Sequence, residues 1–320
     1  MSQSLNYKDI HLIPNYSTLT TRADANTGVC LGQYNFKLPV VPSNMVSCIS
    51  FEKAKWLAEN NYFYILHRFY EYENVLDWIR KNEMPYYSIS LGIQDRDIEF
   101  IDTIRREGLR LDFVTVDVAH GDHERVIQVL NTLAGYKAVY NPKLFIIGGN
   151  IATSDAYIRM SKFVDAVKVG IACGAACITY NKTGFASPMF STVRDIAATK
   201  HYLTNRPLII ADGGIGNNGD IAKALVAGAD MVMCGSLFAC CTDSPAVPDP
   251  ADLTKRLYFG SASSMNGNKK NIEGKTVSLT TNELTYQQKL IEIQQDLASA
   301  ISYAGGKDLK AFKEVNWALL

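Results

Sequence analysis

The sequence has no excess of charge of either sign, because Lys and Arg together number 32 and Asp and Glu together also number 32. A balanced chain creates no overall field that attracts nucleic acid or an anionic membrane. We therefore expect neither as a partner, and any anionic ligand must be bound by local geometry.

Long hydrophobic runs are also missing. No apolar stretch approaches the ~20 residues that a membrane-spanning helix needs, and the first nine residues lack the basic and apolar regions of a signal peptide. The seven cysteines form an odd set without Cys-x-x-Cys pairs or the Cys/His spacing of a zinc site. Reduced thiols in a cytoplasmic protein fit these absences.

What the chain does contain is a series of short apolar runs at intervals of roughly 20 to 35 residues, with helix-like patterns between them. The runs are Leu38–Val41, Tyr62–Leu66, Tyr86–Leu91, Phe113–Val118, Leu144–Ile147, Ala166–Val169, Leu208–Ala211 and Met231–Cys234. Helix-like stretches include Phe51–Asn60, Asp97–Glu107, His123–Gly135 and Gly219–Ala227, and Thr153 or Ser154 is an N-cap candidate. Eight evenly spaced units favour a (β/α)8 TIM barrel, an α/β fold, over an open doubly wound sheet.

The pattern changes after the eighth run. Residues 259–281 are polar, rich in glycine and without period, which is typical of a disordered segment or of a functional flap. A last helical stretch, Glu283–Tyr303, ends at Ala304-Gly305-Gly306, a suitable C-cap. We expect residues 1–320 to form a single domain.

Glycines follow the seventh and eighth runs, in Asp212-Gly213-Gly214 and Gly235-Ser236. The loops after strands 7 and 8 are the recurrent phosphate site of TIM barrels, and glycine lets backbone N–H groups approach an anion. Asp212 could accept hydrogen bonds from ribose hydroxyls. The alternative is that Asp-Gly-Gly is only a tight turn. The Gly-x-Gly-x-x-Gly pattern at 214–219 lacks the acidic residue that a dinucleotide fold needs about 20 positions on.

A thiol and a hydroxyl follow the sixth run. Cys177 lies on a glycine-punctuated loop, and Thr179 comes two residues later. Thiols are good nucleophiles toward electrophilic carbon, and α/β enzymes place such groups on loops after buried strands. The alternative is that Cys177 is a small buried core residue.

Together these motifs resemble the IMP dehydrogenase/GMP reductase family. The resemblance is carried by Gly170-x-x-x-Gly174-x-x-Cys177-Ile-Thr179, the two glycine loops and Glu273-Gly274-Lys275, and it extends from Asn6 to Leu309. Lys182-Thr-Gly-Phe185 and the lack of room for a regulatory CBS pair favour the reductase branch, whereas Ile178 is closer to the dehydrogenase pattern. The reaction implied is reductive deamination of GMP by NADPH to IMP, ammonia and NADP⁺, a step of purine salvage.

The resemblance also implies roles for individual residues. Cys177 would add to purine C2, with Thr179 and Glu273 as a proton relay. GMP would be bound by Ser43, Met45, Asp212, Gly213, Gly214, Gly235, Ser236, Gly260, Ser261, Ala262 and Gly274. The cofactor would be bound by Arg68, Ser90, Gly92, Asp117, Ala119 and His120, and by Ser302 and Tyr303 of a neighbouring subunit in a homotetramer. His67 and His120 could equally be structural histidines.

The loop before Cys177 departs from the family sequence, which reads Gly-Ile-Gly-Pro-Gly-x-x-Cys. Ala172 replaces a glycine, so its β-carbon has a steric cost if φ is positive there. Cys173 adds a second thiol, and Ala175 lacks a side chain that could reach phosphate. These changes put in doubt the monovalent-cation (K⁺) site that the family builds from loop carbonyls, here at Gly174 and Cys177.

Three other functions are compatible with these motifs. One is an IMP dehydrogenase without the regulatory domain. Another is an FMN-binding barrel oxidoreductase, because FMN phosphate also binds after strands 7 and 8. The third is a nucleotide-binding barrel without catalysis. The choice between NADPH and NADH stays open, because no basic cluster can be placed beside the ribose 2′-phosphate.

Overall fold

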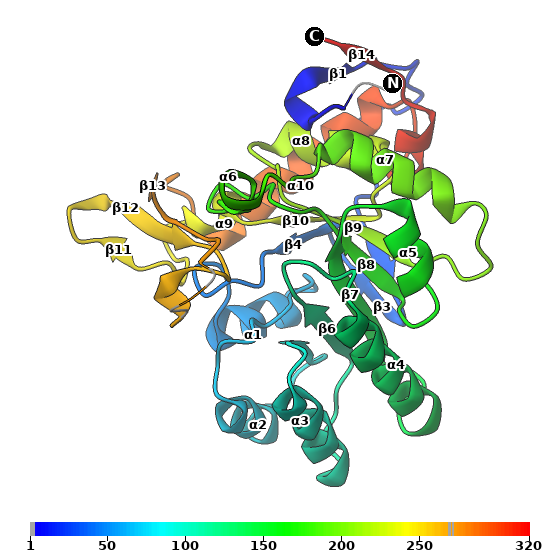
Figure 1. The fold of residues 1–320 in the computed structure, drawn as a ribbon. Coiled ribbons are helices and arrows are strands. Elements are labelled where there is room, and N and C mark those ends of the chain that lie inside the picture. Colours follow the sequence, from blue (N-terminus) through cyan, green and yellow to red (C-terminus); the bar gives the residue numbers. More distant parts are fainter. Residues whose placement is uncertain (1–3, 268–269, 271) are drawn as a thin grey trace.

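A curled parallel sheet of seven strands is the centre of the computed structural model, which describes residues 4–267, 270 and 272–320 (Figure 1). The strands hydrogen-bond in the order β4-β10-β9-β8-β7-β6-β5. Most of their residues are buried, as expected for parallel strands covered by other elements. The strands are β4 (Val40–Pro42), β5 (Ser88–Leu91), β6 (Phe113–Asp117), β7 (Phe145–Ile151), β8 (Ala166–Val169), β9 (Leu208–Asp212) and β10 (Met231–Cys234).

Helices alternate with these strands along the chain. Several begin at a side chain that accepts a hydrogen bond from the first turn, such as Ser50 before α1 and the predicted N-cap Thr153 before α5. The helices are α1 (Phe51–Glu59), α2 (Tyr72–Lys81), α3 (Asp95–Arg106), α4 (Glu124–Val139), α5 (Ser154–Met160), α6 (Thr179–Thr183), α7 (Met189–Lys200), α8 (Asn218–Val226), α9 (Ser236–Ala239) and α10 (Tyr286–Tyr303).

The α/β class and seven of the eight predicted strands are confirmed. The remaining one, Tyr62–Leu66, makes a single parallel bridge, from Leu66 to Ile89 of β5. The N–H of Leu66 donates to Ser88 O at 3.1 Å, and the N–H of Ser90 donates to Leu66 O at 3.0 Å. The second predicted strand therefore lies beside β5, as a barrel requires, but no continuous ladder of hydrogen bonds joins the two.

The prediction that residues 259–281 lack regular structure is wrong for their C-terminal part. Thr276–Thr280 is strand β13, which pairs antiparallel with β12 (Asp252–Phe259), and β11 (Pro248–Asp249) adds a third strand. This small sheet projects beside α6 and α9 (Figure 1). Exposed and half-buried residues alternate along β13, and Val277 and Leu279 pack toward a small apolar cluster. The alternation of polar and apolar residues that is typical of a strand is present at Thr276–Thr280, but it is only five residues long.

The C-terminal helix begins later than predicted. Glu283 has φ +60°, which no right-handed helix contains, so α10 starts after the N-cap Thr285. Its predicted end is confirmed, since Ala304 is the C-cap and Gly305 has φ +85°.

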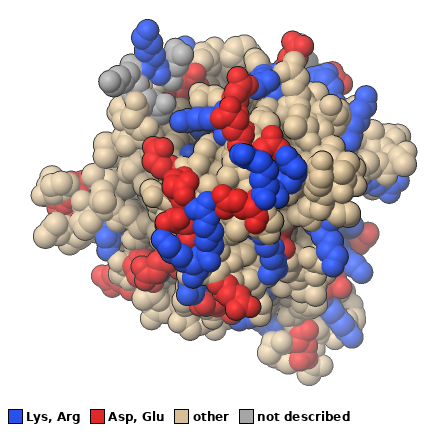
Figure 2. Space-filling view, turned by 90° about the horizontal axis from the view of Figure 1, so that it is seen from below, with Lys and Arg blue, Asp and Glu red and all other residues tan. Residues whose placement is uncertain are grey.

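The two chain ends lie side by side. Strand β1 (Ile10–Leu12) pairs antiparallel with β14 (Trp317–Leu319), and β2 (Val29–Leu31) forms a hairpin with β3 (Tyr34–Phe36). Acidic and basic side chains are interspersed on the face in Figure 2, in line with the balanced composition. None of the helices in the described ranges is long and apolar enough to cross a membrane.

Candidate active site

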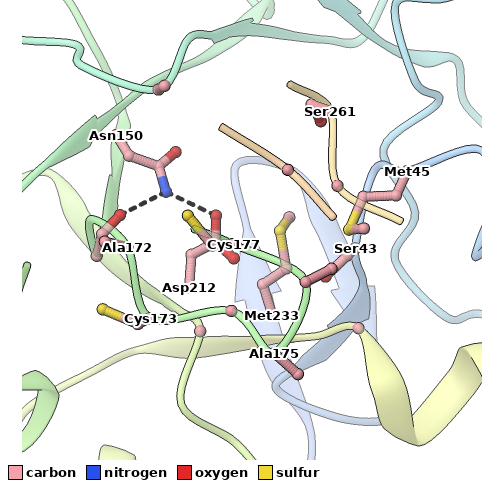
Figure 3. A pocket seen from close by; sticks show the side chains of 18 of the residues that line it. Ser43, Met45, Asn150, Ala172, Cys173, Ala175, Cys177, Asp212, Met233 and Ser261 are labelled. Carbon is pink, nitrogen blue, oxygen red and sulfur yellow. Dashed lines mark hydrogen bonds between the residues drawn. The ribbon is translucent and has the colours of Figure 1, made fainter. Parts of the chain in front are cut away.

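A cavity of about 500 Å³ lies at the carboxyl ends of the parallel strands. The loops after β4, β6, β8, β9 and β10 line it, and the segments around 258–262 and 273–274 complete it. Most of the predicted site residues meet there: Ser43, Met45, Arg68, Asp117, Ala119, Gly174, Cys177, Thr179, Asp212, Gly213, Gly214, Gly235, Ser236, Gly260, Ser261, Ala262, Glu273 and Gly274. Figure 3 shows part of this cavity.

Three of these side chains form one hydrogen-bonded chain. The Cys177 thiol contacts Thr179 Oγ1 at 3.1 Å, and the Thr179 hydroxyl donates to Glu273 Oε2 at 2.6 Å. A proton can therefore pass from the thiol through a hydroxyl to a carboxylate without any rearrangement. Such an arrangement activates a nucleophile.

Backbone hydrogen bonds hold Glu273 in this position. The N–H of Ile178 donates to Glu273 O at 2.8 Å, and the N–H of Lys275 donates to Ala176 O at 2.8 Å. Between them, Gly274 packs so closely that a β-carbon would lie 2.9 Å from Ser263 N. Glycine is thus required where the flap meets the loop that carries Cys177.

The second thiol of the loop has a different environment. Cys173 Sγ lies 3.0 Å from Ile171 O and 3.3 Å from Ser187 O. Burial raises the pKa of the Cys173 thiol to about 12. Cys173 is therefore protonated at neutral pH and a poor nucleophile.

Ala172 does adopt the strained conformation considered from the sequence, with φ +60°. We expect Ala172→Gly to raise the free energy of unfolding by about 0.5–1 kcal/mol, because relief of the left-handed strain exceeds the added entropy of the unfolded chain. Urea unfolding measures the change.

Ala175→Gly is the matched control. This exposed alanine of the same loop lies outside the positive-φ region, so glycine there should lower the free energy of unfolding by about 0.4–1 kcal/mol. Equal changes in both variants would contradict the assignment of strain to Ala172.

The two glycine loops directly follow β9 and β10. Gly213 has φ +108° and Gly214 has φ +78°, so both need the freedom of glycine. Gly235 immediately precedes α9, and a β-carbon on it would collide with the Tyr258 hydroxyl. Backbone amides at such a helix start suit an anionic group.

A buried charged cluster in the same cavity was missed from the sequence. Lys168 Nζ lies 2.5 Å from Asp117 Oδ1, 3.1 Å from Asp212 Oδ2 and 3.3 Å from Asn44 Oδ1. The Asn150 amide donates to Asp212 Oδ2 at 2.8 Å and to Gly170 O at 2.9 Å (Figure 3). The sign of this cluster in the sequence is the lysine inside the apolar run 165–170. No sequence pattern pointed to Asn150 or Tyr258 as site residues.

The remaining predicted residues lie outside the cavity lining. Ser90 Oγ donates to Leu66 O at 2.6 Å, and the N–H of Gly92 donates to Asp97 Oδ1 at 3.0 Å. His120 is exposed on the loop after β6. Ser302 and Tyr303 are at the end of α10, where Ser302 Oγ lies 3.3 Å from Ser17 Oγ.

His67 is structural. Its ring stacks on Tyr70, and burial lowers the pKa of His67 to about 4. In the described ranges, no group of three or more His, Cys, Asp or Glu side chains is arranged to bind a metal ion.

Comparison with known proteins gives a consistent result. Residues 4–317 match the family described as the IMP dehydrogenase / GMP reductase domain. The GMP reductase of Enterococcus faecalis (strain ATCC 700802 / V583) is 43% identical over 98% of this chain and 95% of its own length. The GMP reductase of Staphylococcus carnosus (strain TM300) is 41% identical over the same shares. That of Lactobacillus acidophilus (strain ATCC 700396 / NCK56 / N2 / NCFM) is 41% identical over 99% of this chain and 95% of its own.

Proposed function

Because the chain belongs to the IMP dehydrogenase/GMP reductase family, we propose that its cavity converts GMP and NADPH to IMP, ammonia and NADP⁺. The activity is that of a GMP reductase, the name carried by its full-length relatives. The observation that supports this function in the molecule itself is the chain of hydrogen bonds from Cys177 through Thr179 to Glu273.

Cys177 is the nucleophile of the proposed reaction. Its proton passes through Thr179 to the Glu273 carboxylate, and the thiolate adds to C2 of the guanine base. The proton then returns through Thr179 to the 2-amino group, since an amine leaves only when protonated. Loss of ammonia leaves the purine bound to Cys177 through a C2–S bond.

NADPH supplies the hydride that reaches C2. The C2–S bond then breaks, the electron pair returns to sulfur, and IMP is released. On the cofactor side we place Arg68, Asp117 and Ala119, which line the cavity. Arg68 Nε is buried without a hydrogen-bond partner in the described part of the chain, so its N–H is left to donate to a ligand group. Ser90, Gly92 and His120 remain weaker cofactor candidates because they are outside this lining.

The GMP half of the cavity is formed by the glycine loops and the flap. Gly213, Gly214, Gly235 and Ser236 would hold the phosphate, because their backbone can approach an anion closely. Asp212 would accept hydrogen bonds from the ribose hydroxyls. The other proposed GMP contacts are Ser43, Met45, Gly260, Ser261, Ala262 and Gly274, all of which line the cavity.

Finer parts of the proposal concern the whole protein. We propose one catalytic unit over residues 1–320, a (β/α)8 barrel in which the Tyr62–Leu66 segment occupies the place of the second strand. We also propose a cytoplasmic homotetramer in which Ser302 and Tyr303 reach a neighbouring subunit's cofactor. If K⁺ binds at this loop, Gly174 O would contact the cation and also the Cys177 N–H, from which it accepts a hydrogen bond at 2.9 Å.

The test is oxidation of NADPH followed by absorbance, with ammonia measured in parallel. We expect GMP-dependent oxidation with one ammonia released per NADPH, and a slower rate if choline replaces K⁺. Reduction of NAD⁺ driven by IMP would instead identify a dehydrogenase. A flavin bound to the purified protein would indicate an FMN enzyme, and GMP binding without turnover would indicate a protein that has lost catalysis.

A further inference from the structure

Lys168 is the most deeply buried charged residue of the cavity, with 2% of its surface exposed. It lies on β8, and its ammonium group contacts two carboxylates from other strands, Asp212 at the end of β9 and Asp117 at the end of β6. The side chain therefore spans the interior of the sheet between these two strand ends.

The two carboxylates belong to different halves of the cavity. Asp212 directly precedes the glycine loop Gly213–Gly214 and is joined by Asn150 to Gly170 O, where the cysteine loop begins (Figure 3). Asp117 directly precedes Val118 and Ala119 on the proposed cofactor side. Lys168 is thus a direct link between the two.

The charges of this cluster depend on one another. Burial opposes the charge on Lys168, but Asp117 and Asp212 outweigh it and raise the pKa of Lys168. Burial also opposes the charge of Asp117, but Lys168, with Arg68 and Asn44, lowers the pKa of Asp117. Lys168 and Asp117 therefore each favour the charged form of the other.

Other titratable groups that face Asp212 stay neutral between about pH 6 and pH 8. Burial raises the pKa of each of these four groups: Tyr7, Cys173, Cys234 and Tyr258. Arg68 is the other cation that faces Asp117. Lys168 is hence the cation that contacts both carboxylates.

We propose that Lys168 is a positioning residue that holds the Asp212 carboxylate oriented for the GMP ribose while it holds Asp117 for the cofactor, so that one side chain links both binding sites. This inference rests on the proposed function. It does not give Lys168 a role in the chemistry at purine C2.

The alternative is that the lysine only balances charge in the core. A buried ion pair replaced by apolar groups of similar volume is often tolerated, so stability alone cannot separate the two roles. Ligand affinity and its pH dependence can, because they report on the orientation of Asp212 and on the repulsion between the two carboxylates.

The experiment uses the full-length protein and its Lys168→Met variant, with GMP and NADP⁺ binding measured separately by calorimetry. Without the ammonium, two carboxylates share a buried site and one takes up a proton as the pH falls. We expect K168M to bind GMP about 10-fold more weakly near neutral pH. We also expect its GMP affinity to fall more steeply from about pH 8 to pH 6 than that of the wild type.

A charge-balanced double variant, Lys168→Met with Asp117→Asn, keeps the test valid even if K168M does not fold. With one carboxylate removed, the repulsion between the two is gone, so GMP affinity should return to within about 3-fold of wild type and regain the wild-type pH profile. NADP⁺ binding should be weaker than in the wild type, because Asp117 is no longer a carboxylate. Lys289→Met is the control, because Lys289 is also buried but pairs with Glu292 on α10; it should leave both affinities unchanged.

Wild-type GMP affinity with the wild-type pH profile in K168M would overturn the inference, as would a double variant that does not recover GMP binding. Failure of the proposed function looks different, because it is seen in the wild-type protein, which would then bind no GMP or bind it without turnover.

Discussion

Cys177→Ala is expected to abolish GMP-dependent NADPH oxidation, with a loss in kcat of about 10⁴-fold or more. Sulfur is the atom that bonds to purine C2 in the proposed reaction, and alanine offers no replacement. The Thr179–Glu273 hydrogen bond and the glycine loops do not depend on the thiol, so GMP affinity should stay within about 3-fold of wild type. Stopped-flow or steady-state absorbance gives the rate, and calorimetry gives the affinity.

Cys173→Ala is the matched control for this variant. The two thiols are four residues apart, but Cys173 contacts backbone carbonyls, and burial raises its pKa to about 12. We therefore expect C173A to retain activity near that of the wild type. Comparable losses in both variants would sink the assignment of Cys177 as nucleophile and point to a structural role for the whole loop.

The second large effect is expected for Glu273→Gln. The glutamine amide can still accept the Thr179 hydrogen bond, so the flap should keep its position, but it cannot take up the proton. We expect kcat to fall by about 10²- to 10⁴-fold with GMP affinity nearly unchanged.

Thr179→Val tests whether Glu273 acts through the hydroxyl. If Cys177, Thr179 and Glu273 form one relay, the loss in the T179V/E273Q double variant should be close to that of one single variant, because each breaks the same path. Multiplied losses in the double variant would show that the two residues act independently.

Much of the site could be predicted because its chemistry is local in the chain. Cys177 and Thr179 are two residues apart, on a loop after a buried run, and Asp212-Gly213-Gly214 directly follows another. Parallel strands bring such loops to one edge of the sheet. The structure adds that Gly213 and Gly214 both have a positive φ, which agrees with the tight Asp-Gly-Gly turn considered as an alternative.

The buried lysine cluster could not be predicted in the same way. Lys168 and Asp117 are 51 residues apart, and Asn44 is 124 residues from Lys168. A lysine in an apolar run is consistent with either an outward-facing or an inward-facing side chain. Only the packing of β6, β8 and β9 shows that this one points inward, where two carboxylates offset the cost of burying its charge.

The sequence by itself determined seven of the eight strands of the repeated units, the thiol with its neighbouring hydroxyl and the two glycine loops, because each depends on residues close in the chain. Only the tertiary structure decided that Thr179 donates to a carboxylate 94 residues away, that β13 pairs with β12 and that Lys168 joins two carboxylates. The physical reason is that these contacts depend on how distant segments pack against one another.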